Sequence, residues 1–227
     1  MNHYFSEKPE IKSEKKTIKY TIQNKKFEFI TDNGVFSKSK VDFGTDLMLN
    51  EFLKKNKGLE AKKIKILDIG CGYGVVSVIL KSFYPEISIT LSDVNERALE
   101  LSEENLKKYG INDYHIIKSD AFEKITEKFD VILSNPPIRA GKDIIFKIYS
   151  EAYEHLNENG EFYCVIQTKH GAKSTKKKLM EIFKNCDTVT IDGGYRIFLS
   201  KKYFCKKKAR HKSCFNKLFS TNCFIIW

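Results

Sequence analysis

Short apolar runs alternate with longer amphipathic segments along most of the chain. The apolar runs are rich in Ile, Val and Leu, which is typical of buried strands. They predict strands near 64–69, 87–92, 113–118, 129–134, 161–168, 186–191 and 195–201. The amphipathic segments predict helices near 73–83, 95–109, 143–157 and 173–184. Strands separated by helices favour right-handed crossovers, so we expect an α/β fold with a doubly wound, mostly parallel seven-stranded sheet and helices on both faces.

The N-terminal part of the chain shows strict alternation instead. The segments 17–22 and 26–31 alternate polar and apolar residues with period two, and the residues between them are polar. This pattern predicts a β-hairpin. Thr45 is expected to cap a helix that continues over 46–53, because a side-chain hydroxyl can accept from the first free N–H groups.

The length of the chain bounds its organisation. With 227 residues the chain can bury one sizeable core but not two comfortable ones. Charged residues make up 30% and hydrophobic residues 41%, an ordinary globular balance. We expect an N-terminal β-hairpin and entry helix over 1–57, packed on a main domain over 58–202 and followed by a basic tail over 203–227.

Hydropathy and cysteine usage indicate the compartment. No run of eighteen residues is apolar, and the first five residues lack an apolar export region. We therefore expect a cytoplasmic protein that does not bind membranes. The six cysteines form no C-x-x-C pair, so reduced thiols and no metal site are expected.

Positive charge dominates, with a net charge of +11. Much of the excess lies in 201–227, which contains no acidic residue, and in a lysine cluster between 169 and 178. A solvated surface accounts for lysine-rich composition about as well as a polyanionic partner does. The clustering favours nucleic acid.

A glycine-rich turn follows the strand predicted near 64–69. It reads Gly70-Cys71-Gly72-Tyr73-Gly74 and runs directly into a helix. Glycines let the backbone approach a ligand closely, and the start of the helix offers free N–H groups. A dinucleotide fingerprint would need its third glycine at position 75, where Val75 stands. Asp93 ends the next strand, where it can accept hydrogen bonds from both hydroxyls of a ribose or belong to the start of the following helix.

Asn135-Pro136-Pro137 follows the strand predicted near 129–134. Prolines have no N–H to donate, so the chain must leave the sheet as a stiff, extended corner. The corner fixes the Asn135 amide and leaves backbone carbonyls without partners. An Asn oxygen and a carbonyl together can accept both hydrogens of a planar NH2 group. Such a sequence alone is typical of a loop entry, and its place at the same sheet edge as the glycine turn indicates a site.

These motifs, in this order, resemble those of the class I S-adenosylmethionine-dependent methyltransferases. The resemblance rests on Asp68 to Gly74, Asp93, Ser119-Asp120-Ala121 and Asn135-Pro136-Pro137-Ile138. More narrowly, the chain resembles the small-domain family of ribosomal RNA guanine-N2 methyltransferases. That match rests on Gly34 to Ser37, Val41 to Thr45, Pro136 to Lys142, Gln167 to Ala172 and Gly194 to Arg196. The resemblance covers residues 1–202 and implies a Rossmann-like methyltransferase fold.

The resemblance also implies S-adenosyl-L-methionine as the cofactor and a role for each matching residue. The cofactor-binding residues would be Asp68, Gly70, Cys71, Gly72, Gly74, Asp93, Val94, Asp120, Ala121 and Asn135. The catalytic residues would be Asn135, Pro136 and Pro137. The substrate-binding residues would be Phe36, Ile138, Arg139 and Lys142. Many amine-methylating relatives have an aromatic residue where Ile138 stands, so Phe36 becomes the candidate for stacking on the target base.

The implied reaction is methyl transfer to an exocyclic amine of RNA, at guanine N2 in ribosomal RNA. The implied partner is ribosomal RNA or a ribosomal subunit, and the implied assembly is a monomer or homodimer. Methylation of adenine N6 or of a protein glutamine amide would need the same grip on an NH2 group. A non-catalytic RNA-binding ribosome assembly factor would keep the fold without turnover. A nicotinamide dehydrogenase is disfavoured by Val75 and by the lack of a proton-transfer residue near the expected cleft.

Overall fold

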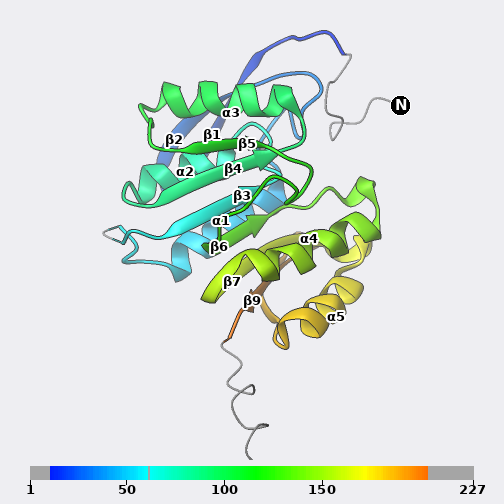
Figure 1. The fold of residues 1–227 in the computed structure, drawn as a ribbon. Coiled ribbons are helices and arrows are strands. Elements are labelled where there is room, and N and C mark those ends of the chain that lie inside the picture. Colours follow the sequence, from blue (N-terminus) through cyan, green and yellow to red (C-terminus); the bar gives the residue numbers. More distant parts are fainter. Residues whose placement is uncertain (1–10, 61, 204–227) are drawn as a thin grey trace, which may run out of the picture.

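The computed structural model describes residues 11–60 and 62–203 (Figure 1). The basic tail predicted over 203–227 lies outside the described residues apart from Tyr203. No helix in the described ranges is long and apolar enough to cross a bilayer. Nor do His, Cys, Asp and Glu side chains gather there in groups of three or more that would suit a metal ion.

A seven-stranded sheet forms the centre of the fold, with the strand order β5-β4-β3-β6-β7-β9-β8. The strands are β3 (Lys65–Ile69), β4 (Ser88–Asp93), β5 (His115–Lys118), β6 (Phe129–Ser134), β7 (Leu156–Gln167), β8 (Asp187–Asp192) and β9 (Tyr195–Lys201). All neighbouring pairs from β5 to β7 are parallel, whereas β9 runs antiparallel to both β7 and β8. The predicted doubly wound, mostly parallel sheet is therefore confirmed.

Helices cover both faces of this sheet, as predicted (Figure 1). The helices are α1 (Phe43–Lys55), α2 (Val75–Phe83), α3 (Glu96–Lys108), α4 (Lys142–His155) and α5 (Ala172–Phe183), with short 3-10 turns η1 (Ile138–Ala140) and η2 (Thr168–His170). Successive side chains of β3 point to opposite faces of the sheet. Ile66 packs in a core with α1, α2 and α3, whereas Leu67 packs in a second core with α4 and α5. The period of two in a strand makes this division possible.

Two predicted boundaries are wrong. Helix α1 begins at Phe43, and its N-cap is Asp42 rather than Thr45. The Asp42 carboxylate accepts from the backbone N–H groups of Gly44 and Thr45 at 2.9 and 3.3 Å, a stronger acceptor for these groups than a hydroxyl. Strand β7 begins earlier than expected, at Leu156, where a register shift relative to β6 adds a further bridge.

The predicted N-terminal hairpin consists of β1 (Lys16–Ile22) and β2 (Lys25–Thr31). It packs beside α3 on the face of the sheet that also carries α1 and α2 (Figure 1). Asn105 of α3 is fully buried and bonds both backbone groups of Ile30, with its oxygen accepting at 2.8 Å and its nitrogen donating at 2.9 Å. The same Asn105 nitrogen donates to the Tyr73 carbonyl at 2.9 Å. One side chain thus joins the hairpin, a helix and the glycine turn.

We expect Asn105→Ala to lower the free energy of unfolding by about 2 kcal/mol, because backbone groups of Ile30 and Tyr73 lose their partner away from water. Urea denaturation followed by circular dichroism measures the change. Asn112→Ala is the matched control, since Asn112 is exposed and its side chain makes one long hydrogen bond to Gly110. Equal stability of the two variants would contradict the linking role of Asn105.

Candidate active site

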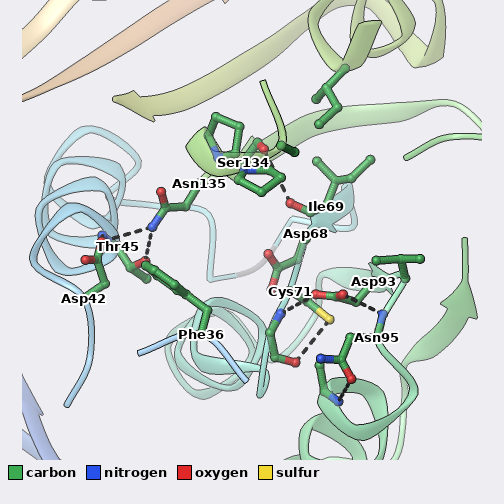
Figure 2. A pocket seen from close by; sticks show the side chains of 18 of the residues that line it. Phe36, Asp42, Thr45, Asp68, Ile69, Cys71, Asp93, Asn95, Ser134 and Asn135 are labelled. Carbon is green, nitrogen blue, oxygen red and sulfur yellow. Dashed lines mark hydrogen bonds between the residues drawn. The ribbon is translucent and has the colours of Figure 1, made fainter. Parts of the chain in front are cut away.

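A cavity of about 580 Å³ opens at the carboxyl ends of β3, β4, β5, β6 and β7 (Figure 2). The predicted site residues that line it are Phe36, Asp68, Gly70, Cys71, Gly72, Asp93, Val94, Asp120, Ala121, Asn135, Pro136, Pro137, Ile138 and Arg139. Gly74 and Lys142 are not part of its wall: Gly74 is the N-cap of α2, and Lys142 is the first residue of α4. The fold thus brings predicted residues from the ends of β3, β4, β5 and β6, together with Phe36, into one space.

The glycine turn is shaped by its own backbone. The N–H groups of Gly70 and Cys71 donate to the Ser92 carbonyl at 2.8 and 3.0 Å, which attaches the turn to β4. The φ angles of Gly70, Gly72 and Gly74 are 72°, 57° and 85°, in the region that favours glycine. A Cβ at Gly70 or Gly72 would meet no atom within 4 Å. Conformation, rather than lack of space, therefore requires glycine at these two positions.

Asp93 is held by backbone donors on both sides of its carboxylate. Its Oδ2 accepts from Gly72 N at 2.9 Å, and its Oδ1 accepts from Asn95 N at 2.9 Å. Burial raises the pKa of Asp93, although these hydrogen bonds oppose the shift. Asn95 caps α3 through the N–H of Ala98, as predicted. A carboxylate can accept about four hydrogen bonds and Asp93 lines the cavity, so it can still accept from a ribose hydroxyl.

Asp68 is buried within β3, and its carboxylate connects this strand to α2. Its Oδ2 accepts from the Ser77 hydroxyl at 2.8 Å. Burial raises the pKa of Asp68 to about 7, the nearby Asp93 shifts it in the same direction, and hydrogen bonds from Ser77 oppose the change. The bond joins the two elements that flank the glycine turn, in line with the expectation that Asp68 organises it.

The turn after β5 supplies another part of the wall. Ser119 donates its backbone N–H to the Asp93 carbonyl at 3.1 Å, and its hydroxyl accepts from Lys124 N at 3.0 Å. Ala121 has a φ of 45°, which bends the chain sharply toward the cavity. Asp120 is exposed at the rim, where its carboxylate can accept from an amino group of a ligand.

The Asn135 amide has a single orientation. Its Nδ2 donates to Asp42 Oδ2 at 3.1 Å and to Thr45 Oγ1 at 2.9 Å. A carboxylate can only accept, so the NH2 side of the amide must face Asp42. Figure 2 shows the amide oxygen turned away from these two residues. Neither this oxygen nor the Pro136 carbonyl accepts a hydrogen bond from any residue in the described ranges, so two acceptors are available to a ligand.

Phe36 belongs to a loop that is fixed at several points beside the glycine turn. Asn95 Nδ2 donates to the Gly34 carbonyl at 2.9 Å, and the Tyr73 hydroxyl donates to the Ser37 carbonyl at 3.3 Å. Phe36 lines the cavity yet remains 39% exposed. Its position suits the predicted stacking on a base at the mouth of the cavity.

Among the wall residues to which the sequence assigned no binding or catalytic role are Asp42, Thr45, Gln167, His170 and Tyr195. Asp42 and Thr45 orient Asn135, and Gln167 Nε2 donates to the Tyr195 hydroxyl at 2.5 Å. All five lie in segments that carried the narrower family resemblance, so the signal in the sequence was the motif and not the individual residue.

Known proteins match both the sequence and the fold. A family model described as "Methyltransferase small domain" matches residues 26–199. "Uncharacterized protein YbxB" of Bacillus subtilis (strain 168) is 44% identical over 204 residues, which cover 88% of this chain and 98% of that protein. "Ribosomal RNA small subunit methyltransferase C" of Enterobacter sp. (strain 638) is 33% identical over 169 residues, which cover 73% of this chain and 46% of that protein. The chain therefore matches less than half the length of the latter enzyme.

A solved structure of "T. Thermophilus 16S rRNA N2 G1207 methyltransferase (RsmC) in complex with AdoMet and Guanosine" is similar with a TM-score of 0.75. The match covers 86% of this chain and 52% of that chain at 23% identity. At this identity the likeness shows a shared fold.

The raised pKa of Asp68 predicts a pH-dependent stability in the cofactor-free protein. An unfolded Asp has a pKa of about 4, so between about pH 4 and the folded pKa of about 7 only the folded state keeps the proton. The free energy of unfolding must fall as the pH rises through this window.

Asp68→Asn should remove this contribution, so that the variant gains stability relative to the wild type between pH 5 and pH 8. Chemical denaturation at both pH values measures the difference. Asp187→Asn, at an exposed position of β8, controls for the loss of one carboxylate. A difference that stays the same at the two pH values would rule out the buried proton on Asp68.

Proposed function

Because the chain belongs to the methyltransferase small domain family, we propose that it transfers a methyl group from S-adenosyl-L-methionine to an exocyclic amine of RNA, at N2 of guanine in ribosomal RNA. The observation that carries the proposal is the Asn135 amide, whose orientation leaves its oxygen for a ligand in the cavity. The names of two relatives support the choice of substrate: a small-subunit ribosomal RNA methyltransferase, and an rRNA N2 methyltransferase solved with AdoMet and guanosine.

The residues on the glycine-turn side of the cavity fit the cofactor. S-adenosyl-L-methionine supplies an activated methyl group when bound, so the protein must hold it and aim the acceptor. A cavity of about 580 Å³ is within the usual range for such ligands. Asp93 would accept from the ribose hydroxyls, the backbone of 69–74 would line the methionine end, and Asp120 with Ala121 would meet the adenine edge.

The residues on the Asn135 side would orient the acceptor amine. The lone pair of an exocyclic guanine amine is delocalised into the ring. Hydrogen bonds from its two N–H groups to Asn135 Oδ1 and the Pro136 carbonyl favour a more localised pair and hold the nitrogen in one direction. Alignment of this kind can lower a barrier by roughly 7–11 kcal/mol at its best. The nitrogen can release its proton after attack, so no general base is needed beforehand.

The remaining contacts with the RNA would come from the loop that contains Phe36 and from the segment that follows Pro137. Phe36 would stack on the splayed-out base, Ile138 would support its other side, and Arg139 and Lys142 would meet phosphates. Because Asp42 and Thr45 orient Asn135, the segment 1–57 would act as part of the catalytic unit with 58–202 rather than as a separate module.

Incubation of ribosomal RNA and of ribosomal subunits with radiolabelled cofactor, followed by nucleoside mapping, tests the proposal. We expect label in N2-methylguanosine. Label in N6-methyladenosine or in protein would select one of the alternative acceptors. Cofactor and RNA binding without any transfer would instead identify an assembly factor.

Asn135→Ala should abolish methyl transfer while leaving cofactor affinity nearly unchanged, because it removes an acceptor that contacts the target amine. Turnover with ribosomal RNA and calorimetry with the cofactor measure the two effects. An equal loss of both would contradict the role assigned to Asn135.

Asp42→Ser tests the positioning of Asn135 without removing the helix cap, since Ser caps helices about as well as Asp does. Its hydroxyl is on a shorter side chain and can donate as well as accept, so the Asn135 amide is no longer restricted to one orientation. We expect kcat to fall on the order of tenfold to a hundredfold, with the free energy of unfolding and the cofactor affinity nearly unchanged.

Asp46→Ser is the matched control, because Asp46 lies in the same first turn of α1 and bonds Tyr20 and Asn50 instead. If the two variants lose activity to the same extent, charge loss at the start of α1 is the cause and Asp42 has no special role.

A further inference from the structure

Many lysines on the described surface form ion pairs with a neighbouring carboxylate. Lys65 pairs with Glu127 at 2.6 Å, and Lys107 pairs with Glu103 at 2.6 Å. Paired charges of this kind add little to the field around a protein, because the opposite charges lie side by side.

One side of the cavity mouth differs. The segment 168–180 contains five lysines and no acidic residue. Lys169 of η2 and Lys173 and Lys177 of α5 are exposed, and none of them forms an ion pair within the described ranges. Arg196 of β9 lies beside them, with its Nε donating to Thr168 Oγ1 at 3.3 Å. We call Lys169, Lys173, Lys177 and Arg196 the basic rim.

Two further lysines of the same segment have other partners. Lys176 donates to the Thr188 hydroxyl at 3.3 Å. Lys178 pairs with Glu181 at 3.8 Å and lies over the Phe146 ring. Lys169, Lys173 and Lys177 are thus the lysines of this segment whose side chains make no hydrogen bond or ion pair within the described residues.

The basic rim begins at the cavity and leads away from it. Lys169 precedes His170, which lines the cavity. The starts of α4 and α5 lie at the same edge of the molecule (Figure 1). Lys173 and Lys177 are one turn apart on the exposed face of α5, which separates them by about 6 Å along the helix axis. A row of cations in this direction suits a phosphate backbone that leaves the cavity and runs along α5.

We propose that the basic rim binds the phosphates of the single RNA strand adjoining the target nucleotide, so that α5 sets the direction in which the strand leaves the cavity. This inference rests on the proposed function, because it takes RNA as the substrate. Phosphate contacts position a strand without reading its sequence, and a single strand can present a splayed-out base where a duplex cannot.

The test compares Lys169→Gln/Lys173→Gln/Lys177→Gln with Lys57→Gln/Lys62→Gln/Lys63→Gln in the full chain. Lys57, Lys62 and Lys63 are exposed and precede β3, at the opposite end of the strand from the cavity. Both triple variants lose the same charge. The probe is a fluorescently labelled single-stranded oligoribonucleotide, whose Kd is measured over a range of salt concentrations. Transfer from radiolabelled cofactor to ribosomal RNA is measured in parallel.

We expect the slope of log Kd against log salt to fall by about 2 in the basic-rim variant, since each phosphate contact on a single strand contributes about 0.7. The slope of the control variant and the cofactor affinity of both variants should match the wild type. Equal slopes in the two variants would overturn the inference. If the wild type itself forms no N2-methylguanosine, the proposed function is overturned instead, so the two failures are distinguishable.

Discussion

A single carboxylate oxygen, Oδ2 of Asp42, joins the start of α1 to the end of β6. It accepts from Gly44 N and Thr45 N, which begins the helix, and from Asn135 Nδ2. An acceptor-only group at this point leaves the Asn135 amide one orientation, with its oxygen free for a ligand. The chemistry proposed for the cavity depends on this oxygen, so the cap of α1 is also the element that prepares the acceptor side.

The hairpin formed by β8 and β9 packs against the start of α1, where Asp42 lies. The rings of Phe43 and Tyr195 lie 5.5 Å apart, and the Tyr195 hydroxyl accepts from Gln167 Nε2. A Cβ at Gly44 would lie 2.9 Å from both Asp42 Oδ2 and the Tyr195 ring. Glycine at position 44 therefore allows Tyr195 to pack against the helix start, and this packing holds the start of α1 against β9.

The sequence predicted the part of the site that local patterns determine. The strand, glycine turn and helix around Gly72 are consecutive, and the apolar runs predicted the sheet strands to within a few residues, except for the start of β7. The bond between Asp42 and Asn135 joins residues that are 93 positions apart, and no periodicity or spacing indicates such a pair. The placement of Thr45 as the helix cap failed for a local reason: the Asp42 carboxylate, three residues earlier, is a stronger acceptor for the first N–H groups of α1 than the Thr45 hydroxyl.

The two halves of the cavity are connected through the N-terminal segment. Asn105 joins Ile30 of the hairpin to the carbonyl of Tyr73 in the glycine turn, on the side proposed for the cofactor. Asp42 joins the entry helix to Asn135, on the side proposed for the acceptor. Since a buried polar group that loses its partner costs free energy, the hairpin and entry helix cannot separate from the sheet without disturbing both halves. The pairing of Ile69 with Ser134 in the central sheet sets the spacing of the two sides, and the N-terminal segment then fixes a group on each of them.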